Sequence, residues 1–113
     1  MEILEASFCG VPLLTIVGEV DHGLAEQLAG AAERSLGPRG TQLLLDFESC
    51  AYLDSGVLSV LLKLVERVGQ EGLIGVIRPA RMVLRLLELT GVTSAHCLRV
   101  FESHDQARSA LGC

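Results

Sequence analysis

The feature that most constrains this chain is a regular alternation between two apolar patterns. Short runs of Val, Ile and Leu, typical of strands, alternate with longer segments in which apolar residues recur every three or four positions, typical of amphipathic helices. We expect strands over residues 2–8, 11–17, 43–45, 73–77 and 98–101. The order β-β-α-β-α-β-α-β-α predicts an α/β fold, in which a mixed, mostly parallel sheet is covered by about four helices. With 113 residues, we expect a single domain over residues 1–113.

Local signals predict where the four helices begin and end. Asp21 is a plausible N-cap for the first helix, and the glycines and proline at 37–40 end it. The second helix is expected from the segment 54–56 to Gln70, with Gly72 as its breaker. Pro79 suits the first turn of the third helix, which Gly91 ends, and Ser103 and Gln106 have capping-box spacing for a fourth.

Two of these helices carry patterns that predict which side is buried. In the second helix, a narrow polar stripe predicts burial over most of the circumference; it consists of Ser59, Lys63, Glu66, Arg67 and Gln70. In the third helix, the expected apolar side is Val83, Leu86, Leu87 and Leu89.

Charge and composition exclude several classes of function. The net charge is −5 and the nine basic residues form no run, so a basic nucleic-acid interface is not expected. No stretch approaches the roughly 18 apolar residues of a membrane span. The N-terminal residues are acidic where a signal peptide would be basic, so we expect a cytoplasmic protein that does not insert into membranes.

The cysteines and histidines give no sign of a metal or cofactor. The four cysteines lie far apart in sequence at 9, 50, 97 and 113, with no CxxC pair. An even count suggests disulfides in a secreted chain, but without a sign of secretion we expect buried or incidental thiols. His22, His96 and His104 do not have the spacing of zinc ligands.

Familiar enzyme signatures are also missing, so we expect a protein that is not an enzyme. The chain has no GxxxxGK[ST] loop, no GxGxxG fingerprint and no GxSxG elbow around Ser55. A Ser-His-Asp triad remains open, because its members need not be neighbours in sequence.

Polar residues follow several of the predicted strands. Asp21, Asp46 and the Asp54-Ser55 pair are expected to share the carboxyl end of the sheet, where ligands of such folds bind. Ser55, just before an apolar helix, either caps that helix or accepts a phosphate, because a helix N-terminus tolerates an anion. Asp21 either caps the first helix or joins a binding surface, and Asp54 is either a structural or a functional acid.

Three segments resemble the STAS domain family (sulfate transporter and anti-sigma factor antagonist). They are Gly18-Glu19-Val20-Asp21 with the residues to 28, Leu44-Leu45-Asp46 with 52–62, and 78–92. The second is the most specific, because Asp54-Ser55 followed by Leu58 and 60–62 is similar to the D-S-[ST]-G-[LI]-x-x-L-L signature. Within the family, the chain is most similar to stand-alone bacterial anti-sigma factor antagonists.

The resemblance implies a phosphorylation switch. Such antagonists bind an anti-sigma factor that is also a serine kinase, and they thereby free a sigma factor for transcription. The kinase phosphorylates the serine after the signature aspartate, which corresponds to Ser55 after Asp54, and a serine phosphatase reverses the modification. The expected partner-binding residues are Asp21, Asp54, Ser55, Gly56 and Leu58.

The chain departs from the signature directly after the acceptor. Where the family has Ser or Thr and then Gly, this chain has Gly56 and Val57. Some STAS relatives are never phosphorylated and act as interaction subunits in lipid-transport or stress-signalling complexes. A subunit of that kind, in a transporter or stress-signalling complex, is the alternative that the sequence leaves open.

Overall fold

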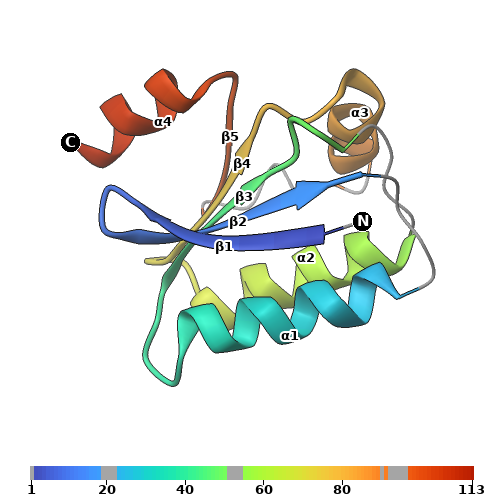
Figure 1. The fold of residues 1–113 in the computed structure, drawn as a ribbon, viewed down its shortest axis with the longest axis horizontal. Helices are drawn as coiled ribbons and strands as arrows, with labels where there is room; N and C mark the ends of the chain where they lie inside the picture. The colour runs from blue at the N-terminus through green and yellow to red at the C-terminus, as the bar shows by residue number, and fades with distance from the viewer. Residues whose placement is uncertain (1, 19–22, 51–54, 90, 92–96) are drawn as a thin grey trace.

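A computed structural model describes residues 2–18, 23–50, 55–89, 91 and 97–113, and its element order is the predicted one (Figure 1). The strands are β1 (Glu2–Phe8), β2 (Val11–Val17), β3 (Gln42–Asp46), β4 (Leu73–Ile77) and β5 (Leu98–Phe101). The helices are α1 (Leu24–Leu36), α2 (Ser55–Val68), α3 (Arg81–Leu89) and α4 (His104–Leu111). The prediction of an α/β fold with a mixed, mostly parallel sheet is confirmed.

The five strands form one sheet in the order β1-β2-β3-β4-β5. β1 runs antiparallel to β2, and the other neighbouring pairs are parallel. The central position of β3 agrees with its continuous apolar run, because Leu43, Leu44 and Leu45 are all fully buried. Pro12 is the second residue of β2, where a missing amide donor is tolerated as expected at a strand beginning.

Strand alternation separates two apolar layers on opposite faces of the sheet. The larger layer packs under α1 and α2, and α3 adds Val83 and Leu87 to it. Figure 1 shows α1 and α2 side by side on this face, with α4 on the other. The smaller layer lies between the sheet and α4; its buried members are Val11, Leu13, Leu44, Ile77, Phe101 and, from α4 itself, Ala107. Among the described residues, no helix is both long and apolar enough to cross a membrane.

Several predicted helix ends are wrong by a few residues. The N-cap of α1 is Gly23 and not Asp21, because the Gly23 carbonyl accepts the first helical bond, from the Gln27 amide at 3.0 Å. The end of α2 is Val68, where Gly69 turns with φ +73, so Gln70 and Gly72 lie beyond it. Helix α3 begins at Arg81, which leaves Pro79 just before the helix.

The burial predicted for two helices is also wrong in part. Only one face of α2 is buried, and it consists of Val57, Leu61, Leu64 and Val68. Leu62 is 41% exposed, and in α3 the expected core residue Leu89 is 72% exposed. In each helix one stripe faces the sheet, and Leu62 and Leu89 lie outside that stripe, so the structure leaves them partly exposed.

The expectation for the cysteines is half correct. Cys50 and Cys97 are buried and lie outside any disulfide, as predicted. Cys9 and Cys113, however, are joined by a disulfide, because the β1–β2 turn and the end of α4 meet above the smaller apolar layer. A separation of 104 residues in sequence hides this proximity.

Candidate functional site

The candidate site lies at the beginning of α2. In Figure 1, the first turns of α1 and α2 lie at the same end of the molecule, near the end of β2. The backbone amide of Gly18, just after β2, donates to the Ser49 carbonyl at 3.2 Å, which joins the segments following β2 and β3. The start of α2 therefore lies at the end of the molecule where the segments that follow β2 and β3 are joined.

Ser55 is the first residue of α2 and is exposed. The helix thus begins at Ser55 itself, within the segment 54–56 where its start was predicted. Its carbonyl accepts a hydrogen bond from the Ser59 hydroxyl one turn later, at 3.1 Å. A phosphate at this position would meet the positive end of the helix dipole and amides that have no partner within the helix.

The residues that follow Ser55 divide between core and surface. Val57 is fully buried and anchors the first turn in the larger apolar layer. Gly56 and Leu58 are half-buried, and Leu62 lies one turn beyond Leu58 with 41% of its surface exposed. Ser55 therefore stands near Leu58, which packs against the edge of the larger layer, and on the same helix as the exposed Leu62.

The structure brings together only part of the predicted site. Ser55, Gly56 and Leu58 lie within one turn of α2. The predicted contributions of Asp21 and Asp54 lie outside the described residues. Asp46 ends β3 as predicted, and it is 5% exposed.

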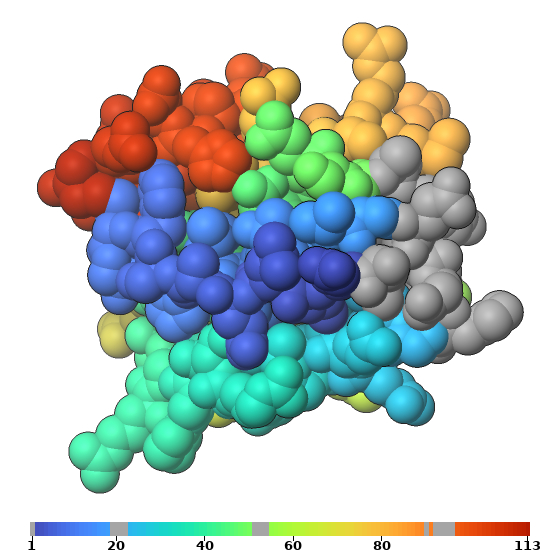
Figure 2. Space-filling view, in the orientation of Figure 1, coloured from blue at the N-terminus to red at the C-terminus, as the bar shows by residue number. Residues whose placement is uncertain are grey.

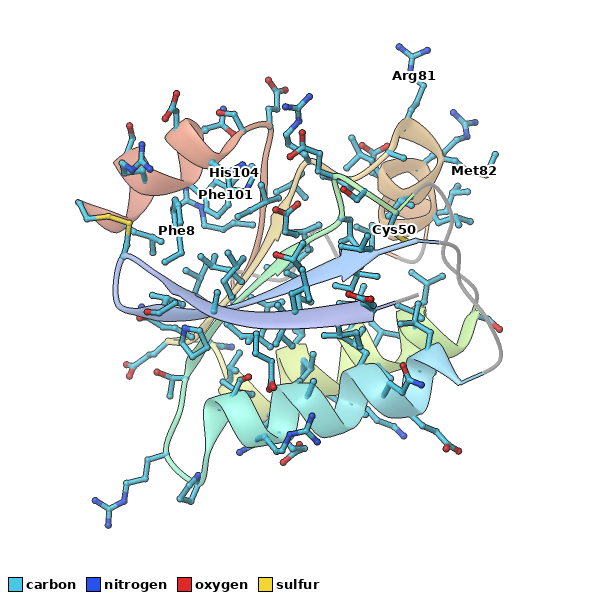
Figure 3. The ribbon with its side chains drawn as sticks, in the orientation of Figure 1. Phe8, Cys50, Arg81, Met82, Phe101 and His104 are labelled. Carbon is cyan, nitrogen blue, oxygen red and sulfur yellow. A yellow bond between two sulfur atoms is a disulfide. The ribbon has the colours of Figure 1, made fainter. Side chains whose placement is uncertain are left out.

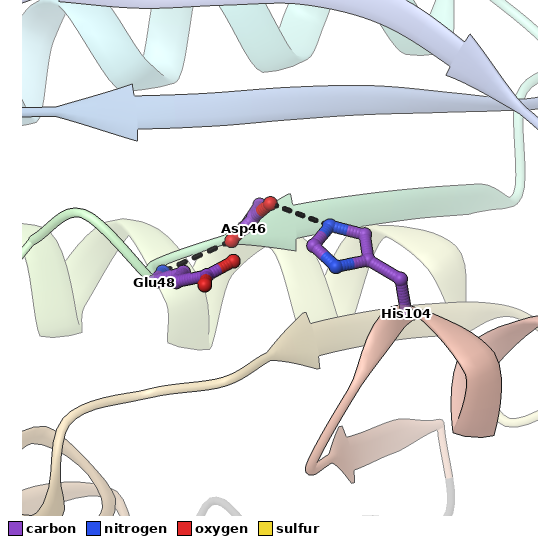
Figure 4. A group of neighbouring side chains, drawn as sticks. All are labelled: Asp46, Glu48 and His104. Carbon is purple, nitrogen blue, oxygen red and sulfur yellow. Dashed lines mark hydrogen bonds and ion pairs between the residues drawn. The ribbon is translucent and has the colours of Figure 1, made fainter.

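Asp46 belongs to a polar group at the other face of the same sheet end (Figure 4). One carboxylate oxygen, Oδ2, lies 2.8 Å from Nε2 of His104, the first residue of α4. The other, Oδ1, accepts the Glu48 amide at 2.9 Å. The Glu48 carboxylate in turn lies 3.3 Å from the Arg78 guanidinium, beyond the end of β4. This group connects the ends of β3 and β4 to the start of α4.

These side chains offer carboxylate oxygens and an imidazole nitrogen, which are atoms that can coordinate metal ions. The donor atoms of Asp46, Glu48 and His104 all lie within 4.8 Å of one another. Both Asp46 oxygens already accept hydrogen bonds and Glu48 faces Arg78, so the group is internally satisfied. Its evident role is structural: it places a hydrogen-bonded carboxylate at the edge of the smaller apolar layer.

Sequence reasoning missed His104 as a member of this group. A signal was available, because His104 follows β5 and the Ser103 cap, and the carboxyl ends of parallel strands meet at one edge of a sheet.

Comparisons with known proteins agree with this architecture. The family model described as "Mlab, STAS domain" matches residues 9–100. An anti-sigma factor antagonist from Mycobacterium paratuberculosis is 25% identical, with 99% of this chain and 94% of the other covered and a TM-score of 0.83. A Thermotoga maritima protein, provisionally classed as an anti-sigma factor antagonist, is 16% identical, with coverages of 98% and 95% and a TM-score of 0.84.

A third similar structure is the anti-sigma factor antagonist SpoIIAA in its unphosphorylated form. It is 16% identical, with 99% of this chain and 98% of the other covered and a TM-score of 0.75. SpoIIAA from Bacillus is similar in its phosphorylated form as well, with 13% identity, coverages of 96% and 99% and a TM-score of 0.74. No curated protein sequence matches the chain at a significant level.

Proposed function

The chain belongs to the STAS domain family, and we propose that it is an anti-sigma factor antagonist that is switched off by phosphorylation at Ser55. Its partner would be an anti-sigma factor with serine kinase activity, and a serine phosphatase would restore binding. We further propose that residues 1–113 form one cytoplasmic domain, which is the substrate of the kinase and not itself an enzyme. The observation that carries this proposal is the exposed Ser55 at the first position of α2.

A phosphate on Ser55 would change binding without unfolding the domain. It adds about −1.5 to −2 charges at neutral pH, at a helix end whose dipole favours anions. The anchor of this turn, Val57, points into the apolar layer and is not displaced by a group on the exposed side. A partner that packs against the site would, in contrast, have to accommodate a bulky dianion. That SpoIIAA has been solved with and without phosphate supports a fold that tolerates the modification.

The proposed contact surface combines polar and apolar residues around Ser55. Its polar residues are Asp21, Asp54 and Ser55. Gly56 lets the partner approach the backbone closely, and Leu58 is its apolar residue. Leu62, one turn after Leu58, is 41% exposed, and an exposed apolar side chain on an otherwise packed helix is typical of a surface that a partner covers. Binding energy concentrates in a few such residues.

The test uses purified protein with its cognate kinase and ATP, followed by mass spectrometry of the phosphopeptide. We expect phosphate on Ser55, none in Ser55→Ala, and loss of kinase binding in Ser55→Asp. Ser59→Asp is the matched control, because Ser59 is exposed on the same helix one turn later. Phosphate on another residue, or unchanged binding by Ser55→Asp, would contradict the proposal.

A second candidate is a constitutive interaction subunit of a transporter or stress-signalling complex. One observation favours it: Gly56 removes the second hydroxyl of the phosphorylation signature. In that case a transporter ATPase, and no sigma regulatory pair, would co-purify with the protein from its source cell. The complex would then form equally well with Ser55→Ala, whereas kinase-dependent release would rule this candidate out.

A further inference from the structure

The disulfide between Cys9 and Cys113 connects two remote parts of the chain. Their Cα atoms lie 5.8 Å apart although 104 residues separate them in sequence. Cys9 is in the turn between β1 and β2, and Cys113 follows the Gly112 that ends α4. In Figure 3 the yellow sulfur bond closes the open side between the hairpin and α4, next to Phe8. Both residues are at least partly accessible, unlike the buried Cys50 and Cys97.

The backbone at Cys9 is unusual for a cysteine. The turn is closed by the pair Phe8–Val11, and its two central residues, Cys9 and Gly10, have φ of +54° and +78°. Two-residue hairpin turns of this kind favour Asn-Gly or Gly-Gly, because a Cβ is strained at positive φ. A cysteine therefore occupies this position against the preference of the turn, which points to a role for its side chain.

Helix α4 makes few apolar contacts of its own. Ala107 is the only buried residue of α4, and Leu111 packs against the smaller layer while half-buried. Further support comes from side chains at its surface: the Arg108 guanidinium lies 5.5 Å from the Phe8 ring centre, and the His104 ring meets Phe8 edge-on at 6.0 Å. Figure 2 shows α4 (red) seated against the hairpin end of β1 and β2 (blue). An element with so little buried surface opens readily unless it is tethered.

We propose that Cys9 and Cys113 form a reversible disulfide latch that controls the docking of α4. In a reducing compartment the pair is present as two thiols, since stable disulfides are rare there and those that form are mostly redox-sensing or catalytic. The oxidant is a low-molecular-weight disulfide. The Cys113 thiolate attacks it, forms a mixed disulfide and releases one thiolate; the Cys9 thiolate then attacks the Cys113 sulfur and releases the second. One external disulfide is thereby reduced to two thiols for each latch that closes.

Opening the latch would affect both the smaller apolar layer beneath α4 and the Asp46–His104 pair at the start of α4. Undocking uncovers the smaller apolar layer, including Phe101 and Leu13, and separates His104 from Asp46. Asp46 lies two residues before Glu48 and three before Ser49, the residue that accepts the Gly18 amide near the start of α2. The latch is independent of phosphorylation at Ser55, so either proposal can fail without the other.

The first test is chemical. The full-length protein is equilibrated with oxidised glutathione, its free thiols are alkylated under denaturing conditions, and the digest is read by mass spectrometry. We expect a linked pair of Cys9 and Cys113 peptides, alkylated Cys50 and Cys97, and full reversal by dithiothreitol. Alkylation of all four cysteines after oxidation, or linkage of another pair, would overturn the proposal.

The second test distinguishes the effect of the disulfide from the effect of a strained residue in the turn. Hydrogen exchange of α4 amides should be faster in the reduced protein by about tenfold or more, with little change in α1 and α2. In reducing buffer, Cys113→Ser should have the same urea midpoint as the wild type. In oxidising buffer, its midpoint should be lower than that of the wild type, because it cannot form the disulfide. Cys9→Asn, which suits the turn, should equal or exceed the wild-type midpoint when reduced and fall below it when oxidised. Equal effects of Cys113→Ser in both buffers, or identical α4 exchange in both states, would show that no latch operates.

Discussion

Among the residues that the structure describes, twenty-one buried residues form the layer between the sheet and helices α1 to α3, whereas six, with Ala107 of α4 among them, form the layer between the sheet and α4. The larger layer is held by apolar burial, with a surface connection between the helices in which Arg67 binds Glu33 and the Gly37 carbonyl. The smaller layer adds a disulfide and the Asp46–His104 pair to a thin apolar contact. The comparison indicates that the sheet with α1 and α2 forms a stable frame. Helix α4 is held on that frame by few apolar contacts, together with the disulfide and the Asp46–His104 pair.

This difference bears on where a switch can be placed. Ser55 sits on a helix whose inner face is fixed by four buried residues, so a charge on its outer face leaves the frame intact. The C-terminal helix has the opposite character, because local changes at its few anchors can release it while the rest stays folded.

The largest effect is expected for Leu61→Ala in the larger layer. Leu61 is fully buried, so its truncation removes apolar burial and leaves a cavity, lowering the free energy of unfolding by about 2–5 kcal/mol. Urea denaturation measures this loss. Leu62→Ala is the matched control on the same helix, and because Leu62 is 41% exposed its loss should be clearly smaller. Equal losses in the two variants would contradict the assignment of the buried face of α2.

Gly75→Ala probes how tightly the sheet packs beneath α4. A Cβ at Gly75 would lie 2.5 Å from Leu44 Cδ2 and 2.9 Å from Phe101 Cε2, closer than either side chain allows without moving. We expect a loss of about 1–3 kcal/mol in urea denaturation, typical of overpacking. Gly30→Ala in the middle of α1 meets only Arg34 Nη1 at 3.4 Å and should be neutral or stabilising by up to about 1 kcal/mol. If both variants lowered or both raised the free energy of unfolding, the inference of tight packing at Gly75 would be contradicted.

Most of the fold could be predicted from the sequence, because periodicity and punctuation act locally. The strand boundaries 2–8, 11–17, 73–77 and 98–101 agree with the structure, as does the Ser103–Gln106 cap. Helix burial was less predictable, since it depends on what packs against each helix. Leu62 and Leu89 have core-type side chains, but no other element of the described chain covers them fully.

The candidate site was predicted only where it follows strand order. Ser55 at a helix start and Asp46 at the end of β3 were expected from the pattern of a parallel sheet. The pairing of Asp46 with His104 across 58 residues, and of Cys9 with Cys113, depends on how α4 folds back over the sheet. Strand order could have placed His104 at the same end of the sheet as Asp46, but no local pattern specifies which side chains pair over such a distance.

His104→Ala tests the polar anchor of α4. Without the imidazole, the Oδ2 oxygen of the buried Asp46 loses its partner, and the cost is about 1–3 kcal/mol in urea denaturation. The double variant with Asp46→Ala should lose less than the sum of the single losses, because it removes both members of the pair. Strict additivity would indicate that the two side chains do not interact in solution. Ser109→Ala, at an exposed position of the same helix, should leave stability nearly unchanged.

Ser103→Ala is expected to have the smallest effect, and one confined to α4. The Ser103 hydroxyl accepts the Gln106 amide at 3.0 Å, while the Gln106 side chain accepts the Glu102 amide at 2.7 Å. Loss of this cap should cost about 1 kcal/mol, seen as faster hydrogen exchange in α4 under reducing conditions. Ser103→Asp keeps an acceptor at the helix start and should behave as the wild type. If Ser103→Ala accelerated exchange equally in α1 and α2, α4 would unfold together with the frame, and the contrast between the two faces would be lost.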